Sequence, residues 1–464
     1  MAVTDIVQLG ISDVLQRMRA GELSPVELVR VYLERIEKLN PDLNVYLTVL
    51  AEGALAAAKA AEQALMRGEE VGPLHGIPIA LKDNCEVAGV RMTAGTKFLR
   101  DHVSTTDCEV AKRLQNAGAI LLGKLHMHEW AIGATTRNPH FGPCRNPWDR
   151  QRIPGGSSGG SGAAIAADMT LAAIGTDTGG SVRIPAALNG ISGIRPTIGR
   201  VSIRGVVPVS WTFDTIGPMA RCAEDVAHLL QVVAGYDSEE PTSFDVPVPD
   251  YFAELRAGVK ELRIGVAGGH FQTEPEPAVT SAVQKAARIF AGLGAQVEEV
   301  VFERAEEMID RMSELILTDA AAFHEARMEE KPEDFGHDVM TRLRRGASVS
   351  GMRYALARQE QRRWQRYIEQ TFNRYDLLLA PTCGIGAPLI EESDGVETTR
   401  LLTRFTYPLN LAAVPVISIP CGFTPAGLPI SLQIAARHWQ EALILRAAWT
   451  YQQVTDWHLR RPRL

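Results

Sequence analysis

Two loops rich in glycine and serine hold the residues whose types and spacing could do chemistry. Ser157 lies in residues 155–162, which read GGSSGGSG, and Ser181 lies in residues 175–185, which read GTDTGGSVRIP. Glycine lets a backbone approach a ligand closely and direct several N–H groups at one point. A serine hydroxyl can attack a carbonyl carbon or pass on a proton. Together these features indicate acyl-transfer chemistry.

Ser181 is the candidate nucleophile. It stands just ahead of Ile184-Pro185, and a proline in the first turn is typical of a helix start. Small residues ahead of a helix give converging N–H donors that can stabilise a developing oxyanion. The alternative is a tight turn in which the serine only caps a helix.

A serine nucleophile needs a base, and Lys82 is the better candidate for that base. The eleven histidines are scattered, and none has the sequence context of a Ser-His-Asp triad. Lys82 closes an apolar strand predicted at residues 77–81, where partial burial would lower the pKa of the amine. The alternative is an ordinary lysine whose ammonium reaches solvent from a strand end.

Three other motifs carry less weight. Residues 155–159 fit G-x-S-x-G, but no acid and histidine in a convincing context follow them. Residues 118–124 fit G-x-x-x-x-G-K, yet Leu125 stands where a magnesium-binding Ser or Thr is needed. His126 and His128 are two residues apart, which does not match the zinc motif. We expect their segment to line or border a substrate pocket.

The elements between and around the loops predict an α/β fold. A helix over residues 163–168 and a strand over 171–174 would return both loops to the same edge of a sheet. Strands alternate with helices through the rest of the chain, which favours a mixed or mostly parallel sheet covered on both faces. Residues 303–374 are predicted to be mostly helical.

Composition restricts the class of protein. The chain has 464 residues, 45% of them hydrophobic and 22% charged, with a formal net charge of −7. This balance argues against nucleic acid or an acidic membrane as a partner. Six scattered cysteines without a CxxC pair favour a reduced, cytoplasmic protein. No signal peptide or membrane span is expected, because the apolar stretches are short.

The motifs resemble those of the amidase signature enzymes over nearly the whole chain. The matching segments are residues 76–84, 94–96, 123–124, 146–149, 155–197, 376–382 and 429–433. The resemblance implies an α/β/α sandwich around a large mixed, mostly parallel, twisted sheet. It implies one domain over residues 1–464, with the signature region at about 70–220 and a more variable helical region at about 300–375.

The resemblance also implies a role for each site residue. Ser181 is the implied nucleophile, Ser157 the bridging serine on a cis peptide bond, and Lys82 the final proton acceptor. The implied oxyanion hole consists of the backbone N–H groups of Thr178, Gly179, Gly180 and Ser181. Asp177, Arg183 and Ser158 would shape the site. Neither a cofactor nor a metal is implied.

The family includes two kinds of activity. One is a stand-alone amidase, and the other is the glutaminase subunit of a tRNA-dependent amidotransferase. That subunit has an acidic residue for the glutamine amine five positions before the proline that matches Pro408, where this chain has Thr403. The missing carboxylate argues against glutamine. Arg342 could hold a carboxylate, but we expect it on a solvated helix face.

The substrate pocket is expected from three segments with aromatic and apolar residues. The candidate lining residues are Met127, Trp130, Trp211, Phe213, Thr403, Phe405 and Tyr407. They favour a hydrophobic or aryl amide, cleaved through a seryl acyl-enzyme, with aryl esters and carbamates also accepted. We therefore expect a monomer or homodimer whose partner is a small-molecule amide, with no nucleic acid or membrane. Other readings are the glutaminase subunit, a non-catalytic binding protein on this fold, or aromatics that are simple core.

Overall fold

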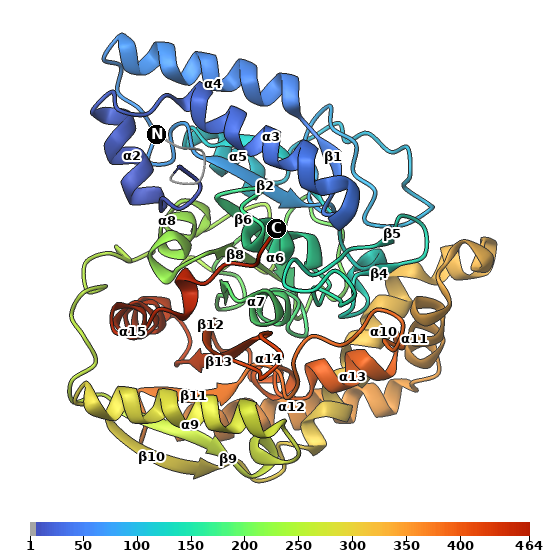
Figure 1. The fold of residues 1–464 in the computed structure, drawn as a ribbon. Helices are drawn as coiled ribbons and strands as arrows, with labels where there is room; N and C mark the ends of the chain where they lie inside the picture. The colour runs from blue at the N-terminus through green and yellow to red at the C-terminus, as the bar shows by residue number, and fades with distance from the viewer. Residues whose placement is uncertain (1–5) are drawn as a thin grey trace.

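A mixed sheet of eleven strands organises the computed structural model, which describes residues 6–464 (Figure 1). The strand order is β1-β3-β2-β6-β8-β7-β12-β13-β11-β9-β10. These strands are β1 Tyr46–Val49, β2 Pro78–Lys82, β3 Ile120–Leu125, β6 Ala172–Asp177, β7 Ser192–Arg195, β8 Thr215–Ala220, β9 Arg263–Gly268, β10 Gln296–Val301, β11 Leu377–Pro381, β12 Val416–Phe423 and β13 Pro429–Ala435. Two further strands, β4 Arg137–Asn138 and β5 Gly142–Pro143, pair with each other.

The direction of the strands confirms the mixed sheet but not its predicted parallel character. The pairs β2–β3, β2–β6, β9–β10 and β9–β11 are parallel. The other six adjacent pairs are antiparallel. The expectation of a mostly parallel sheet is therefore wrong. The β12–β13 pair is antiparallel because a short turn joins the two strands, and a short turn permits only antiparallel pairing.

Helices flank the sheet, as the predicted fold class requires (Figure 1). The pair α6–α7 and the pair α8–α15 both contact the central strands, and α10, α11 and α12 pack together beside them. The helices are α2 Ile11–Arg19, α3 Pro25–Leu43, α4 Ala51–Met66, α5 Glu109–Asn116, α6 Gly159–Ala166, α7 Arg183–Asn189, α8 Ala223–Val233, α9 Pro277–Gly292, α10 Glu307–Glu330, α11 His337–Ala347, α12 Gly351–Thr371, α13 Glu397–Thr403, α14 Tyr407–Leu411 and α15 Glu441–Gln453. Within residues 6–464, none of these helices has the length and apolar character needed to cross a membrane.

The parallel strands β2 and β6 bring the two serine loops and Lys82 to one edge of the sheet. Because neighbouring parallel strands end at the same edge, Lys82 at the end of β2 lies near Asp177 at the end of β6. Helix α6 starts just after Ser157, and its small buried residues pack against the sheet before β6 returns the chain. The helix and strand predicted between the loops are both present.

Candidate active site

Lys82 and Ser157 form a buried pair. The Lys82 ammonium nitrogen, Nζ, donates to Ser157 Oγ at 2.7 Å and to Thr176 Oγ1 at 2.7 Å. The lysine is completely buried, and burial lowers its pKa to about 7. The Gly156-Ser157 peptide bond is cis. A lysine in this environment becomes neutral as the pH rises through about 7, and the neutral amine can accept a proton from Ser157.

The second serine loop meets the first through its backbone. The Ser158 N–H donates to the Ser181 carbonyl at 3.2 Å. Ser158 Oγ accepts from the Thr176 N–H and donates to the Thr176 carbonyl, both at 3.2 Å, which fixes this loop to β6. Among the described residues, the Ser181 hydroxyl forms no hydrogen bond with Ser157 Oγ. The structure thus brings Lys82 and Ser157 into contact and leaves Ser181 Oγ available to a ligand.

The backbone of residues 178–181 is oriented by hydrogen bonds to its carbonyl groups. The Thr178 carbonyl accepts from Asn410 Nδ2 at 2.7 Å, and the Gly179 carbonyl accepts from Thr406 Oγ1 at 2.6 Å. In the described chain, the N–H groups of Thr178, Gly179 and Ser181 have no acceptor. The Gly180 N–H donates to Asp177 Oδ1 at 2.8 Å, so it is not available for its predicted oxyanion role.

A buried cluster of three charged side chains supports this loop. Asp177 accepts from Arg183 Nε at 3.0 Å and from Arg195 Nη1 at 3.3 Å, and all three side chains are completely buried. Burial alone would raise the pKa of Asp177, but the two arginines outweigh it and hold the pKa far below its usual range. Arg183 also donates to Gln433 Oε1 at 2.8 Å. Asp177 and Arg183 therefore position the loop, and neither side chain is free to react.

A small cavity of about 40 Å³ lies beside Ser181, and an arginine is among the residues that line it. Arg342 on α11 lines it and is only 8% exposed, so the expected solvated position is wrong. Its Nη2 donates to the carbonyls of Gly395 and Val396, the latter at 3.3 Å, while its buried Nε has no acceptor. The neighbouring Arg344 and Arg345 are exposed, which explains why the charged sequence suggested a surface helix.

The seven residues predicted to line the pocket divide into two groups. Thr403 and Tyr407 line the cavity beside Ser181. The other five lie elsewhere: Met127, Trp130, Phe213 and Phe405 are buried in a hydrophobic cluster, and Trp211 is 43% exposed. Aromatic packing accounts for two of them, since Trp130 contacts His324 and Phe405 contacts Phe271.

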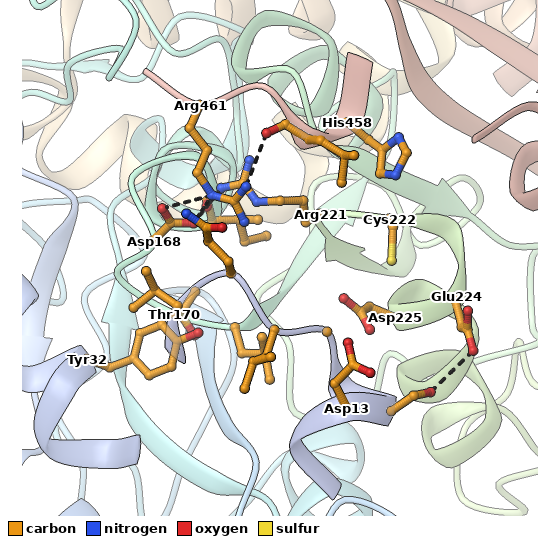
Figure 2. Close-up of a pocket in the computed structure, with 18 of the residues that line it drawn as sticks. Asp13, Tyr32, Asp168, Thr170, Arg221, Cys222, Glu224, Asp225, His458 and Arg461 are labelled. Carbon is orange, nitrogen blue, oxygen red and sulfur yellow. Dashed lines mark hydrogen bonds and ion pairs between the residues drawn. The ribbon is translucent and has the colours of Figure 1, made fainter. Parts of the chain in front are cut away.

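A larger cavity of about 420 Å³ lies at the other end of α6 (Figure 2). There Asp168 accepts from Arg221 Nη2 at 2.7 Å and also pairs with Arg461. Arg221 further donates to the Ile165 carbonyl at 2.5 Å. Cations near the last carbonyls of a helix are stabilising. These charges hold the far end of the helix whose first turn follows Ser157.

Comparisons with known proteins define the family. The family model described as Amidase matches residues 27–445. The A subunit of glutamyl-tRNA(Gln) amidotransferase from Moorella thermoacetica is 40% identical, covering 98% of this chain and 97% of that protein. The structure described as "An unexpected vestigial protein complex reveals the evolutionary origins of an s-triazine catabolic enzyme" has a TM-score of 0.91 and 34% identity, covering 96% of this chain and 98% of the other. A bacterial aryl acylamidase has a TM-score of 0.90 and 27% identity, covering 98% and 99%.

The chain belongs to the amidase signature family, and it is an amidohydrolase by that membership. The mixed sheet flanked by helices agrees with the solved structures of this family. The sequence-based expectation about partners is wrong. A monomer or homodimer that meets only a small-molecule amide does not fit relatives that are themselves subunits of an amidotransferase.

Proposed function

We propose that this chain is the amide-hydrolysing subunit of a multi-subunit enzyme and that it releases ammonia from glutamine. The observation that carries the proposal is Arg342, which shares a small cavity with Ser181 and has an unpaired Nε. A guanidinium binds a carboxylate with strong, charge-assisted hydrogen bonds. A carboxylate-bearing amide therefore fits this site better than the aryl amide expected from the sequence.

The proposed reaction uses the side chains of Lys82, Ser157 and Ser181. Ser181 Oγ attacks the carboxamide carbon as Ser157 takes its proton and passes its own hydroxyl proton to neutral Lys82. The N–H groups of Thr178 and Gly179, with that of Ser181, stabilise the oxyanion. Proton return through Ser157 releases ammonia, and water then hydrolyses the acyl-enzyme. A rotation of the Ser181 side chain toward Ser157 completes the relay.

Ammonia release from glutamine by the full chain tests the substrate. The variant Arg342→Gln should raise KM by at least about tenfold, because a charge-assisted hydrogen bond to the substrate is lost. The matched control is Arg345→Gln, since Arg345 is exposed on the same helix. Hydrolysis of an aryl amide but not of glutamine, or an unchanged KM in Arg342→Gln, would contradict the proposal.

A second candidate is an amidase for a carboxylated amide that lacks an amine, such as glutaramate. Thr403 favours it, because this residue lines the cavity where the resemblance implies a carboxylate for the glutamine amine. Thr403 Oγ1 donates to the Thr399 carbonyl at 2.7 Å, so the position holds a neutral, occupied hydroxyl. A higher kcat/KM for glutaramate than for glutamine would select this candidate over the first.

The proposed partner is a different protein chain, as the names of the relatives suggest. Native mass spectrometry of the tagged chain, purified from the organism that encodes it, tests whether it binds a different protein chain. We expect the mass of a complex with a different chain. Recovery of the chain alone, or only with copies of itself, would contradict it.

A further inference from the structure

Helix α11 carries Arg342 and is tied at its N-terminal end to the segment that precedes the Ser157 loop. The Gly336 N–H, at the start of α11, donates to Glu129 Oε2 at 2.8 Å. In the first turn, Asp338 Oδ2 lies 3.0 Å from His128 Nε2. Residues four apart share one face of a helix, so Asp338 and Arg342 point the same way. Contacts made at His128 and Glu129 therefore hold the first turn of the helix that carries Arg342.

Gly395 connects Asp338 with Arg342 directly. A Cβ atom on Gly395 would collide with the Asp338 carboxylate, which shows how closely the two residues pack. The carbonyl of the same glycine accepts from Arg342 Nη2. Because one residue contacts both side chains, movement of the Asp338 carboxylate would displace the carbonyl that orients the guanidinium.

His128 is fixed from its other side by the catalytic loop. Its backbone N–H donates to the Ser157 carbonyl at 3.0 Å. Its ring is completely enclosed: Thr135 Oγ1 lies 3.3 Å from Nδ1, and a Cβ atom on Gly133 would collide with the ring. His128 thus links the Ser157 loop with the helix that carries Arg342.

Asp338 brings a carboxylate to this link. Burial would raise the pKa of Asp338, but attraction to His128, its hydrogen bond and the nearby Arg342 outweigh burial and lower the pKa to about 2. The carboxylate is therefore ionised under all ordinary conditions. The carboxylate can accept a hydrogen bond from His128 Nε2 whenever that nitrogen carries a proton.

We propose that His128 and Asp338 form a positioning pair that fixes Arg342 for the carboxylate of the substrate. The inference rests on the proposed function, since it requires a carboxylate at Arg342. Neither residue lines the cavity beside Ser181, so both act through Arg342. The pair gives the histidine segment, which the sequence placed at the border of a pocket, a role in substrate binding.

Steady-state kinetics of the full chain on two primary amides test the pair. Glutaramate carries a carboxylate, and butyramide lacks it. The variants are His128→Gln, Asp338→Asn and their double variant, with His337→Gln as the matched control because His337 is exposed on the same helix. Calorimetric binding of glutarate provides a second measurement for variants with little turnover, and thermal unfolding checks that each variant is folded.

We expect KM for glutaramate, and Kd for glutarate, to rise about tenfold in each pair variant, with kcat and the butyramide kcat/KM changed less than about twofold. The double variant should lose no more than either single variant, because the two residues act as one unit. Equal losses on both amides, a change in kcat alone, additive losses, or the same loss in His337→Gln would overturn the inference.

Arg342→Gln separates this inference from the proposed function. If that variant leaves KM for glutaramate and Kd for glutarate unchanged, the carboxylate site itself is wrong and both proposals fall. If it raises them but the His128 and Asp338 variants do not, only the positioning pair is wrong. A wild-type chain that neither hydrolyses glutaramate nor binds glutarate would reject the positioning pair, whereas ammonia release from glutamine decides the proposed function separately.

Discussion

The pH dependence of hydrolysis should report the protonation of Lys82. Burial lowers the pKa of this amine from 10.5 to about 7, and the group can accept a proton from Ser157 only when it is neutral. Activity should therefore be lost as the pH falls through 7. At pH 8 an amine with a pKa of about 7 is about nine-tenths neutral. At the same pH an amine with the ordinary pKa of 10.5 would be less than about 1% neutral.

The expected profile follows from these fractions. The kcat/KM for ammonia release should be near its plateau at pH 8 and should fall to about 1% of the plateau at pH 5. Asp214 also titrates in this range, because burial raises its pKa to about 6. The variant Asp214→Asn distinguishes the two groups. Loss of this negative charge lowers the pKa of Lys82 further, so the acid limb should move to lower pH without disappearing.

The variant Lys82→Arg provides the decisive comparison. A guanidinium cannot lose its proton in this pH range, so activity should fall by at least about 10³-fold. Lys97→Arg is the control, since the Lys97 side chain is 53% exposed and pairs with Asp334. An acid limb at or below pH 5 in the wild type, or Lys82→Arg with more than a tenth of wild-type activity, would refute the role of Lys82.

Three further predictions concern the nucleophile, the substrate and the ion cluster. Ser181→Ala should abolish labelling by a fluorophosphonate and reduce kcat by at least about 10³-fold, and equal labelling of the variant and the wild type would show that Ser181 is not the nucleophile. Thr403→Asp should raise kcat/KM for glutamine relative to glutaramate by about tenfold, because a carboxylate would face the substrate amine, and an unchanged ratio would remove Thr403 from specificity. Asp177→Asn should lower the free energy of unfolding by about 3–5 kcal/mol in urea denaturation, since it leaves two buried arginines without a carboxylate, and a loss below about 1 kcal/mol would contradict that account.

The local features of the chain were predictable because they depend on neighbouring residues. The helix that starts at Pro25 has Ser24 as its cap, whose Oγ accepts from the N–H groups of Val26 and Glu27. The helix and strand between the serine loops follow in the same way from a short apolar run and its flanking glycines. The apolar strand before Lys82 left both a buried and a solvent-reaching amine open, and the structure shows the buried one.

The remaining features depend on residues far apart in the sequence. Asn410 and Thr406 hold the carbonyl groups of the 178–181 loop from more than 200 positions away, and no local pattern marks them. Arg342 has the same charge as its exposed neighbours, so only packing shows that it faces the cavity. For Trp130, Phe213 and Phe405 the error was the reverse: they were expected to line the pocket but lie in the hydrophobic core. Large aromatic side chains are common in both cores and pockets, so their type alone does not distinguish the two. In the described chain, the N–H groups of residues 178–181 that have no acceptor mark the same site, and this observation requires no assumption about the residues that line the pocket.

The ion cluster explains why the site can keep three N–H groups without an acceptor. A buried donor with no partner is costly, and a flexible loop would turn such groups toward its own carbonyls or toward water. Here those carbonyls already accept from Asn410 and Thr406, and Asp177 holds the Gly180 N–H. The cost of burying Asp177 and its two arginines is partly offset by their mutual hydrogen bonds, although the buried Arg195 Nε has no acceptor within the described residues. Because these hydrogen bonds hold the loop in place, a developing oxyanion is the partner that we propose for its N–H groups.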